Sequence, residues 1–158
     1  MKVRILTFLA MTGFIMAACA PQVDTAAEEE AVRAMGTAWQ AFDDEQNAAG
    51  VAGLFAVDGS AHWEGRQPAI GPQEIELFMF ESYAFDPGGE GSWGSDRLHL
   101  AASGDLAVEE GAYQNPADQG RYITVYQKVG DEWKVAADMS VSTAPNGGAP
   151  AWAQTLLD

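Results

Sequence analysis

The chain has 158 residues, of which 47% are hydrophobic, a length and composition that predict one folded domain with its own core. Its 23 Asp and Glu against 8 Lys and Arg give a formal net charge of −15, which disfavours nucleic acid and anionic lipid surfaces as partners. One cysteine excludes an intramolecular disulfide, and one cysteine with two histidines excludes a closed Cys/His zinc site.

Residues 1–18 have the pattern of a secretory signal peptide. Lys2 and Arg4 precede an uncharged, mostly apolar run that is shorter than the ~20 residues of a membrane-spanning helix. The run ends in Met-Ala-Ala-Cys19, which resembles the lipobox of bacterial lipoproteins, although Met16 stands where that family usually has Leu. We expect Cys19 to be acylated, with ordinary cleavage after Ala20 as the alternative. By the same resemblance, the periplasmic face of the outer membrane is the expected location.

The mature chain is strongly acidic, because removal of residues 1–18 leaves six basic and 23 acidic residues, a net charge of −17. We expect a lipidated N-terminus and tether over 19–27, one domain over 28–142 and an Ala/Pro/Gly-rich tail over 143–158. The membrane is therefore contacted through the N-terminal lipid only.

Two helices are expected at the start of the domain. Thr25-Ala-Ala-Glu28 is typical of a capping box, and apolar residues then recur at helical spacing to about Gln46. Asn47 can cap a second helix that carries Val51, Leu54 and Phe55 and ends at Asp58-Gly59.

A short strand over Ser60–Glu64 and a turn precede a third helix that opens at Gly71-Pro72. Strands are then expected over Trp93–Ala102, Leu106–Gln114, Arg121–Val129 and Glu132–Ser142. Helices followed by strands predict an α+β fold, with helices packed on one face of a mostly antiparallel sheet.

Three stretches resemble the ketosteroid-isomerase-like, SnoaL-like branch of the nuclear transport factor 2-like superfamily. They are Trp39–Ile75, with Leu-Phe-Ala-Val-Asp58 and Ile-Gly-Pro-Gln-Glu-Ile75; Ser103–Ala107 with Gly111 and Tyr113; and Gly120–Met139. The resemblance is closest to uncharacterised exported members, and it implies a cone-shaped α+β barrel with a pocket between the helices and the sheet.

The ketosteroid isomerase residues are not preserved. By this resemblance, the site of the tyrosine donor falls at Trp39, the base near Trp63 and the acidic donor near Thr124. We therefore expect no ketosteroid isomerase activity.

His62 and Glu64 are the candidates for acid–base chemistry. Alternation in an extended strand places them on one face and Trp63 on the other, so they form either a catalytic pair in the cavity or a solvated pair at its rim. His99 shares a face with Arg97 and is expected to face solvent or a partner. The same alternation separates Asp138 from Trp133, Val135 and Met139, which favours a structural role for it. No metal or cofactor is expected.

The favoured function is a lipid-anchored domain that binds a small hydrophobic molecule or a peptide without catalysis. The alternatives are an isomerase, cyclase or hydrolase that uses His62 and Glu64, and an interaction domain with a filled cavity. The candidate ligand-binding residues are Trp39, Phe55, His62, Trp63, Tyr83, Tyr113, Tyr122 and Tyr126.

A homodimer is expected from the strand Arg121–Val129. One of its faces carries Tyr122 and Tyr126 and the other Ile123 and Val125, so both faces need a cover. A second copy is the expected cover of the outer face, as the resemblance also implies, and the tail from Thr143 is the alternative.

Overall fold

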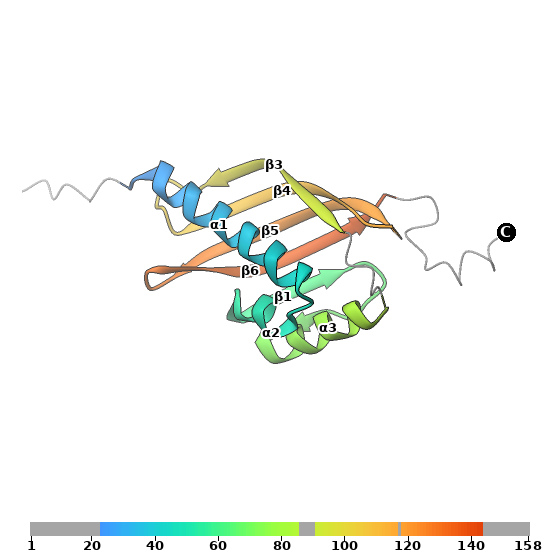
Figure 1. The fold of residues 1–158 in the computed structure, drawn as a ribbon. Helices are drawn as coiled ribbons and strands as arrows, with labels where there is room; N and C mark the ends of the chain where they lie inside the picture. Colours follow the sequence, from blue (N-terminus) through green and yellow to red (C-terminus); the bar gives the residue numbers. More distant parts are fainter. Residues whose placement is uncertain (1–22, 86–90, 117, 144–158) are drawn as a thin grey trace, which may run out of the picture.

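The structure is a computed structural model that describes residues 23–85, 91–116 and 118–143. Its helices are α1 (Thr25–Asp44), α2 (Ala48–Gly53) and α3 (Gly71–Phe85) (Figure 1). Its strands are β1 (Phe55–Trp63), β2 (Ala69–Ile70), β3 (Ser92–Leu100), β4 (Leu106–Gln114), β5 (Gln119–Val129) and β6 (Glu132–Ser142). The predicted signal peptide, Cys19 and the tail beyond Thr143 lie outside the described residues.

The strands form one sheet in the order β2-β1-β6-β5-β4-β3. The β1–β6 pair is parallel and the other pairs are antiparallel. The predicted α+β fold and the four strands after α3 are confirmed. Gly104 lies in the turn before β4, and Gly130 lies in the turn before β6. Their φ angles are 71° and 64°, a conformation that glycine adopts without strain.

The N-cap of the first helix lies one residue before Thr25, the predicted cap. Asp24 is the N-cap, and its carboxylate accepts a hydrogen bond from the Ala27 backbone N–H at 3.2 Å. Glu28, expected to complete a capping box, instead accepts from the Lys128 ammonium at 2.5 Å and the Trp133 indole at 2.8 Å. The bond from Lys128 lowers the pKa of Glu28. These contacts attach the start of α1 to the β5–β6 hairpin.

The second helix is shorter than predicted and the first strand is longer. Asn47 caps α2 as expected, with its side-chain oxygen 2.9 Å from the Gly50 nitrogen. The helix ends at Gly53, whereas the prediction extended it to Asp58. The Val135 N–H donates to the Leu54 carbonyl at 2.9 Å, so pairing with the distant strand β6 draws this segment into the sheet.

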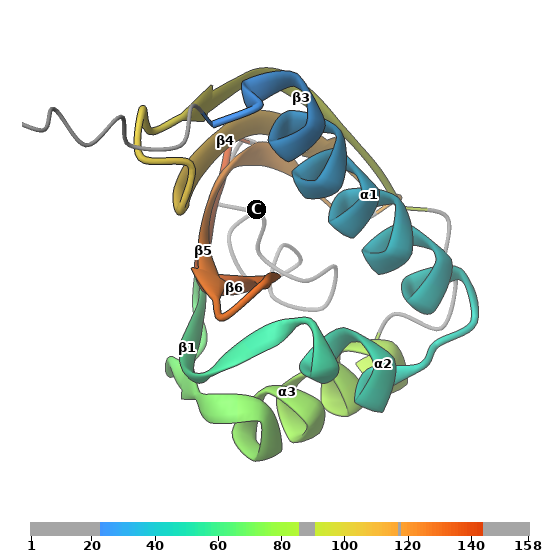
Figure 2. The ribbon, with the colours of Figure 1, turned by 90° about the vertical axis from the view of Figure 1, so that its left-hand side faces the viewer.

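The core lies between the helices and the concave face of the sheet. In Figure 2, α1 crosses one side of the molecule opposite the curved strands, and α2 and α3 lie at the β1 end. The core is formed mainly by Val32, Trp39, Val51, Phe55, Ile75, Phe78, Met79, Tyr126, Trp133 and Val135. This packing holds α1 over the inner face of the sheet, where the candidate site is found.

Candidate functional site

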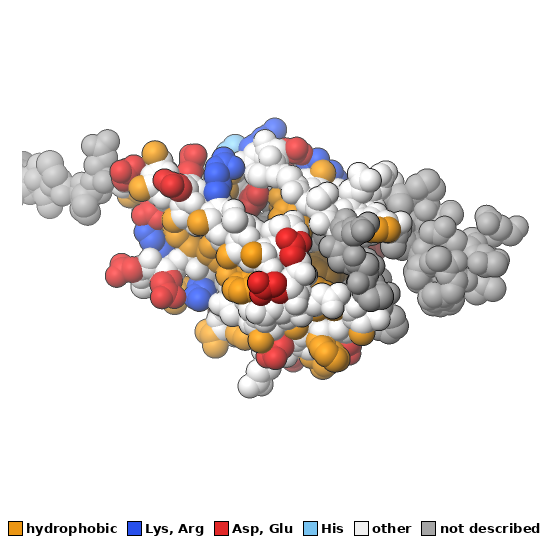
Figure 3. All heavy atoms as spheres, in the orientation of Figure 1, with side chains coloured by type: hydrophobic (Ala, Val, Ile, Leu, Met, Phe, Trp, Pro, Cys, Tyr) orange, Lys and Arg blue, Asp and Glu red, His pale blue; other side chains and the backbone are white. Residues whose placement is uncertain are grey.

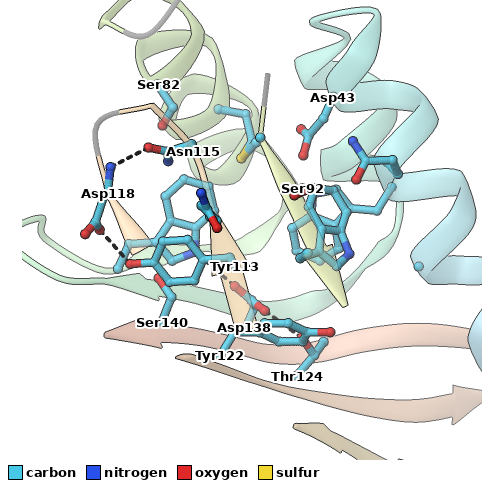
Figure 4. Close-up of a pocket in the computed structure, with 18 of the residues that line it drawn as sticks. Asp43, Ser82, Ser92, Tyr113, Asn115, Asp118, Tyr122, Thr124, Asp138 and Ser140 are labelled. Atoms are coloured by element: carbon cyan, nitrogen blue, oxygen red, sulfur yellow. Dashed lines mark hydrogen bonds between the residues drawn. The ribbon is translucent and has the colours of Figure 1, made fainter. Parts of the chain in front are cut away.

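A cavity of about 620 Å³ lies between α1, α3 and the inner face of the sheet. In Figure 4, Asp43 enters it from α1 and Ser82 from α3, opposite Tyr122, Thr124 and Asp138 of the sheet. Among the described residues, seven aromatic side chains line it: Trp39, Trp63, Tyr83, Trp93, Tyr113, Tyr122 and Tyr126. Its volume is in the range of small-molecule sites.

Two glycines allow tyrosine rings to approach the sheet closely. A Cβ at Gly111 would lie 2.4 Å from the Tyr122 ring and 2.3 Å from the Gly94 carbonyl oxygen. A Cβ at Gly120 would lie 2.5 Å from the Tyr113 ring. The absence of a side chain at these two positions therefore makes room for two aromatic walls of the cavity.

Asp138 is buried at the base of the cavity, on the face opposite to the one expected. Val125 pairs with Ala137 and Tyr126 with Val135, so Ala136 is an extra residue in β6. This bulge shifts the alternation, which turns Asp138 inward and leaves Met139 exposed. The predicted face of Asp138 was wrong because the prediction assumed uninterrupted alternation.

The Asp138 carboxyl has a polar partner on each oxygen. Oδ1 accepts from the Trp63 indole N–H at 2.9 Å, and Oδ2 lies 2.7 Å from the Thr124 hydroxyl. Burial raises its pKa, against the effect of these two hydrogen bonds. The resemblance placed a base near Trp63 and an acidic donor near Thr124. In the structure, both residues instead form hydrogen bonds with the single carboxyl group of Asp138.

A second carboxyl, Asp43, lies on the wall formed by α1. It accepts a hydrogen bond from the Tyr83 hydroxyl of α3, and Trp39 is a further hydrogen-bonding partner. Burial raises the pKa of Asp43 to about 6, with a smaller contribution from the neighbouring charge of Asp44. A carboxyl group with this pKa changes its charge near neutral pH.

The remaining tyrosine hydroxyls of the cavity also donate to carboxylates. Glu109 accepts from Tyr122 at 3.0 Å and from Tyr126 at 2.8 Å, and Asp118 accepts from Tyr113 at 2.7 Å. Burial, together with these carboxylates, raises the pKa values of all three phenols, so the neutral phenol is the stable form.

The predicted ligand-binding residues divide into two groups. Six line the cavity: Trp39, Trp63, Tyr83, Tyr113, Tyr122 and Tyr126. Phe55 instead packs in the core, where its ring contacts Trp39 with centroids 5.3 Å apart. His62 pairs in the sheet with Met139, on the outer face, and is not among the lining residues.

Glu64 lines the cavity although alternation grouped it with His62. The strand β1 ends at Trp63, so alternation does not extend to Glu64, which accepts from the Ser142 backbone N–H at 2.7 Å. The structure therefore does not bring His62 and Glu64 together in the cavity. Arg97 and His99 are exposed, as expected.

Five acidic lining residues were not anticipated: Asp43, Glu81, Glu109, Asp118 and Asp138. Asp43 lies one helical turn after Trp39, so the period of α1 already places it on the aromatic side of the helix. Glu109 lies two residues from Ala107 and Gly111, which are buried on the inner face, so strand alternation carried a signal for it as well.

The comparisons with known proteins show the fold. Neither a protein-family model nor a curated protein matches the chain. A domain of unknown function with a cystatin-like fold from Nostoc punctiforme is 16% identical, with a TM-score of 0.67 over 84% of each chain.

Two further solved structures agree with this result. A nuclear transport factor 2-like protein from Novosphingobium aromaticivorans is 14% identical, with a TM-score of 0.62 over 85% of this chain and 91% of its own. A ketosteroid isomerase-like protein from Erwinia carotovora atroseptica is 17% identical, with a TM-score of 0.62 over 75% of this chain and 98% of its own. The chain therefore has the nuclear transport factor 2-like cone fold.

The described residues contain neither a candidate membrane-spanning helix nor a candidate metal-ligating cluster. No helix among them has the length and apolar character needed to cross a membrane. Within the same residues, no group of three or more His, Cys, Asp or Glu side chains is arranged to hold a metal ion. The acidic residues of the cavity are thus distributed along its walls.

Proposed function

We propose that this chain is a ligand-binding domain of the SnoaL-like branch that holds a small, mostly apolar molecule in the cavity. The observation that carries the proposal is a volume of about 620 Å³ walled by seven aromatic side chains of the described residues. A filled core would leave no such volume, because protein interiors pack to nearly the density of organic crystals. The cavity reaches the surface at Glu64 and Glu81, both of which are exposed.

A blocking substitution on α1 tests this proposal. Gly36 lines the cavity, and a Cβ at this position would meet nothing within 4 Å. The neutral fluorescent dye N-phenyl-1-naphthylamine should bind the purified protein, and Gly36→Phe should lower its affinity at least about fivefold. Gly53→Phe is the matched control, since Gly53 is also helical with open space around it but does not line the cavity.

The result of this test is decisive in either direction. Dye binding that is lost in Gly36→Phe and kept in Gly53→Phe supports the cavity as the binding site. No dye binding by the wild-type protein, or equal affinities in both variants, would contradict the proposal. Native mass spectrometry of the purified protein adds an independent search for a molecule that co-purifies with it.

A second candidate function is proton-transfer catalysis of the isomerase, cyclase or hydrolase kind. One observation favours it: Asp138 is a buried carboxyl group with a raised pKa in the wall of a ligand-sized cavity. In this candidate Asp138 takes the role that the sequence assigned to His62 and Glu64. A co-purified molecule that the wild-type protein converts and Asp138→Asn does not would favour catalysis over binding alone.

Ketosteroid isomerisation fits the geometry poorly. That reaction needs hydrogen-bond donors for a developing oxyanion, and each such donor contributes ~3 kcal/mol or more. The hydroxyls of Tyr83, Tyr122 and Tyr126 already donate to Asp43 and Glu109. The expectation of no ketosteroid isomerase activity therefore remains a prediction with additional support.

Export and lipidation are part of the same proposal. The mature protein is proposed to begin at an acylated Cys19 and to be held at the periplasmic face of the outer membrane. Cys19→Ser should move the protein from the membrane fraction to the soluble fraction of cells. Unchanged fractionation would contradict lipidation.

We also propose that the domain forms a homodimer through the outer face of β5 and β6. Ile123, Met139 and Val141 are 44%, 52% and 52% exposed there, and Ile123 and Met139 are direct neighbours across the two strands. Ion pairs between Arg121 and Asp96 and between Arg97 and Glu110 lie beside this apolar strip. An apolar centre with a charged rim is typical of protein–protein interfaces.

A further inference from the structure

The tyrosine hydroxyls of the cavity are already used as hydrogen-bond donors to carboxylates. The hydroxyls of its four tyrosines all donate to carboxylates of the protein, and the Trp63 indole donates to Asp138. Each carboxylate oxygen has two lone pairs, so Glu109 retains acceptor capacity after receiving one phenol on each oxygen. A ligand that brings its own N–H donors therefore finds acceptors, whereas an anionic ligand would compete with the carboxylates for these phenols.

The charged side chains that line the cavity are also predominantly acidic. Six carboxyl side chains of the described residues line the cavity, against one cationic side chain, Arg66. Figure 3 shows the same excess of acidic side chains (red) on the face that carries α1.

The single lining cation is already neutralised. The Arg66 guanidinium forms a salt bridge with Glu81 at 2.7 Å and donates to the Phe78 carbonyl at 3.1 Å. It also lies over the Phe78 ring, 3.7 Å from the ring centroid, and donates to the Ser82 hydroxyl. The carboxylates of Asp43, Glu109 and Asp118 have no comparable cationic partner in the described cavity wall, where they accept hydrogen bonds from phenols and other neutral groups.

The aromatic walls complete a surface that suits a positive charge. Trp39 and Trp93 form a corner, with ring centroids 6.4 Å apart and planes at 74°, and Trp39 is also a hydrogen-bonding partner of Asp43. The face of an aromatic ring attracts a cation, most strongly when water is excluded. The raised pKa of Asp43 agrees with a carboxylate that lacks a cation beside it.

We infer that the cavity selects an organic cation, a small molecule with an apolar or aromatic body and an amine or quaternary ammonium group. A metal ion is a poorer match, because the acidic side chains of the described residues are not grouped as ligands. The ammonium would lie near Asp43 and Glu109, and its apolar body would lie against Trp39 and Trp93. This inference rests on the proposed binding function and adds the charge of the ligand to it.

Three probes of similar size and different charge test the inference. They are 2-phenylethylamine, which is a cation near neutral pH, 2-phenylethanol, which is neutral, and phenylacetate, which is an anion. Each is titrated into the purified full-length protein, and the indole N–H signals of the tryptophans are followed by NMR. The amine should bind at least about tenfold more tightly than the alcohol, a difference of ~1.4 kcal/mol, and phenylacetate should bind most weakly.

Two adjacent residues of β4 provide the variant and its matched control. Glu109 faces the cavity, whereas Glu110 faces outward and pairs with Arg97 at 3.9 Å. Glu109→Gln should lower the affinity for the amine at least about fivefold and change the affinity for the alcohol less than about twofold. Glu110→Gln removes the same charge from the outside, so it measures any general attraction of a cation to an acidic protein.

The outcomes separate the inference from the function on which it rests. If the alcohol or phenylacetate binds as tightly as the amine, the cation inference is wrong and the binding function stands. If none of the three probes binds while the dye binds, the cation inference is wrong and the binding function stands; if the dye does not bind either, both are wrong. If Glu110→Gln weakens amine binding as much as Glu109→Gln does, the electrostatic attraction between the amine and the protein is not located in the cavity, and the inference is wrong. Should Glu109→Gln fail to fold, Asp43→Asn provides the same comparison.

Discussion

The two faces of β5 and β6 differ in chemistry although they belong to the same two strands. The inner face carries Tyr122, Thr124 and Asp138, which are buried and joined to other polar groups of the cavity. The outer face carries Ile123 and Met139, which are large, apolar and exposed. Strand alternation thus assigns ligand binding to one side of the sheet and, as we propose, association to the other. The following variants change one face at a time.

The largest effect is expected at the outer face. Ile123→Asp places a charge at the centre of the proposed interface and should weaken self-association by about 100-fold or more, which analytical ultracentrifugation measures. Leu77→Asp is the control, because Leu77 of α3 is also exposed, at 58%, but lies away from the sheet face.

Dimerisation of the wild-type protein should also strengthen with salt, because each mature chain carries a charge of −17. A wild-type protein that remains monomeric at roughly tens of micromolar would contradict the dimer.

A large loss of stability is expected at Gly111, on the inner face. In Gly111→Ala the new Cβ would lie 2.3 Å from the Gly94 carbonyl oxygen and 2.4 Å from the Tyr122 ring. We expect the free energy of unfolding to fall by about 2–4 kcal/mol, because neither neighbour can move without disturbing the sheet. Urea denaturation measures this change. Gly94→Ala on the neighbouring strand meets nothing within 4 Å and should have a much smaller effect; equal losses would show that the close contact is not the cause.

A smaller, pH-dependent effect is expected at Asp43. Its folded pKa of about 6 lies above its ordinary value of 3.8, so the folded protein binds the proton more tightly than the unfolded chain. This group therefore favours folding below about pH 4, and its contribution is lost as the pH rises through about 6. The Asn side chain of Asp43→Asn cannot ionise, so the variant should not show this loss. The free energy of unfolding of the variant minus that of the wild-type protein should be about 1–3 kcal/mol larger above pH 6 than at pH 4.

The Asp43 prediction depends on the groups that face this carboxyl. They are Tyr83 of α3, Trp39 and Asp44 of α1, and Asp138 of β6. The exposed neighbour Asp44 supplies the control variant Asp44→Asn, which removes the same formal charge from the same helix. Thermal or urea denaturation across pH measures both variants. A stability difference for Asp43→Asn that does not change with pH would show that its carboxyl is not perturbed in the folded protein.

Much of the fold was predictable because its signals are local. Gly71-Pro72 opens α3 as expected, and β4 and β6 have the predicted bounds, since turn-forming residues flank alternating apolar residues there. The end of α2 was not predictable in the same way. Leu54 and Phe55 continue a helical pattern, and only their pairing with Val135, eighty residues later, makes them part of the sheet.

The sequence by itself determined the α+β class, the acidic charge and the aromatic character of the site, because composition and periodicity along the chain carry them. The tertiary structure alone decided which carboxyl groups meet in the cavity. The extra residue Ala136 turns Asp138 inward, and the packing of both α1 and α3 against α2 brings Tyr83 to Asp43, forty residues away in the chain. The physical reason is that local preferences determine which elements form, whereas strand register and helix packing, which depend on distant residues, determine the direction in which each side chain points.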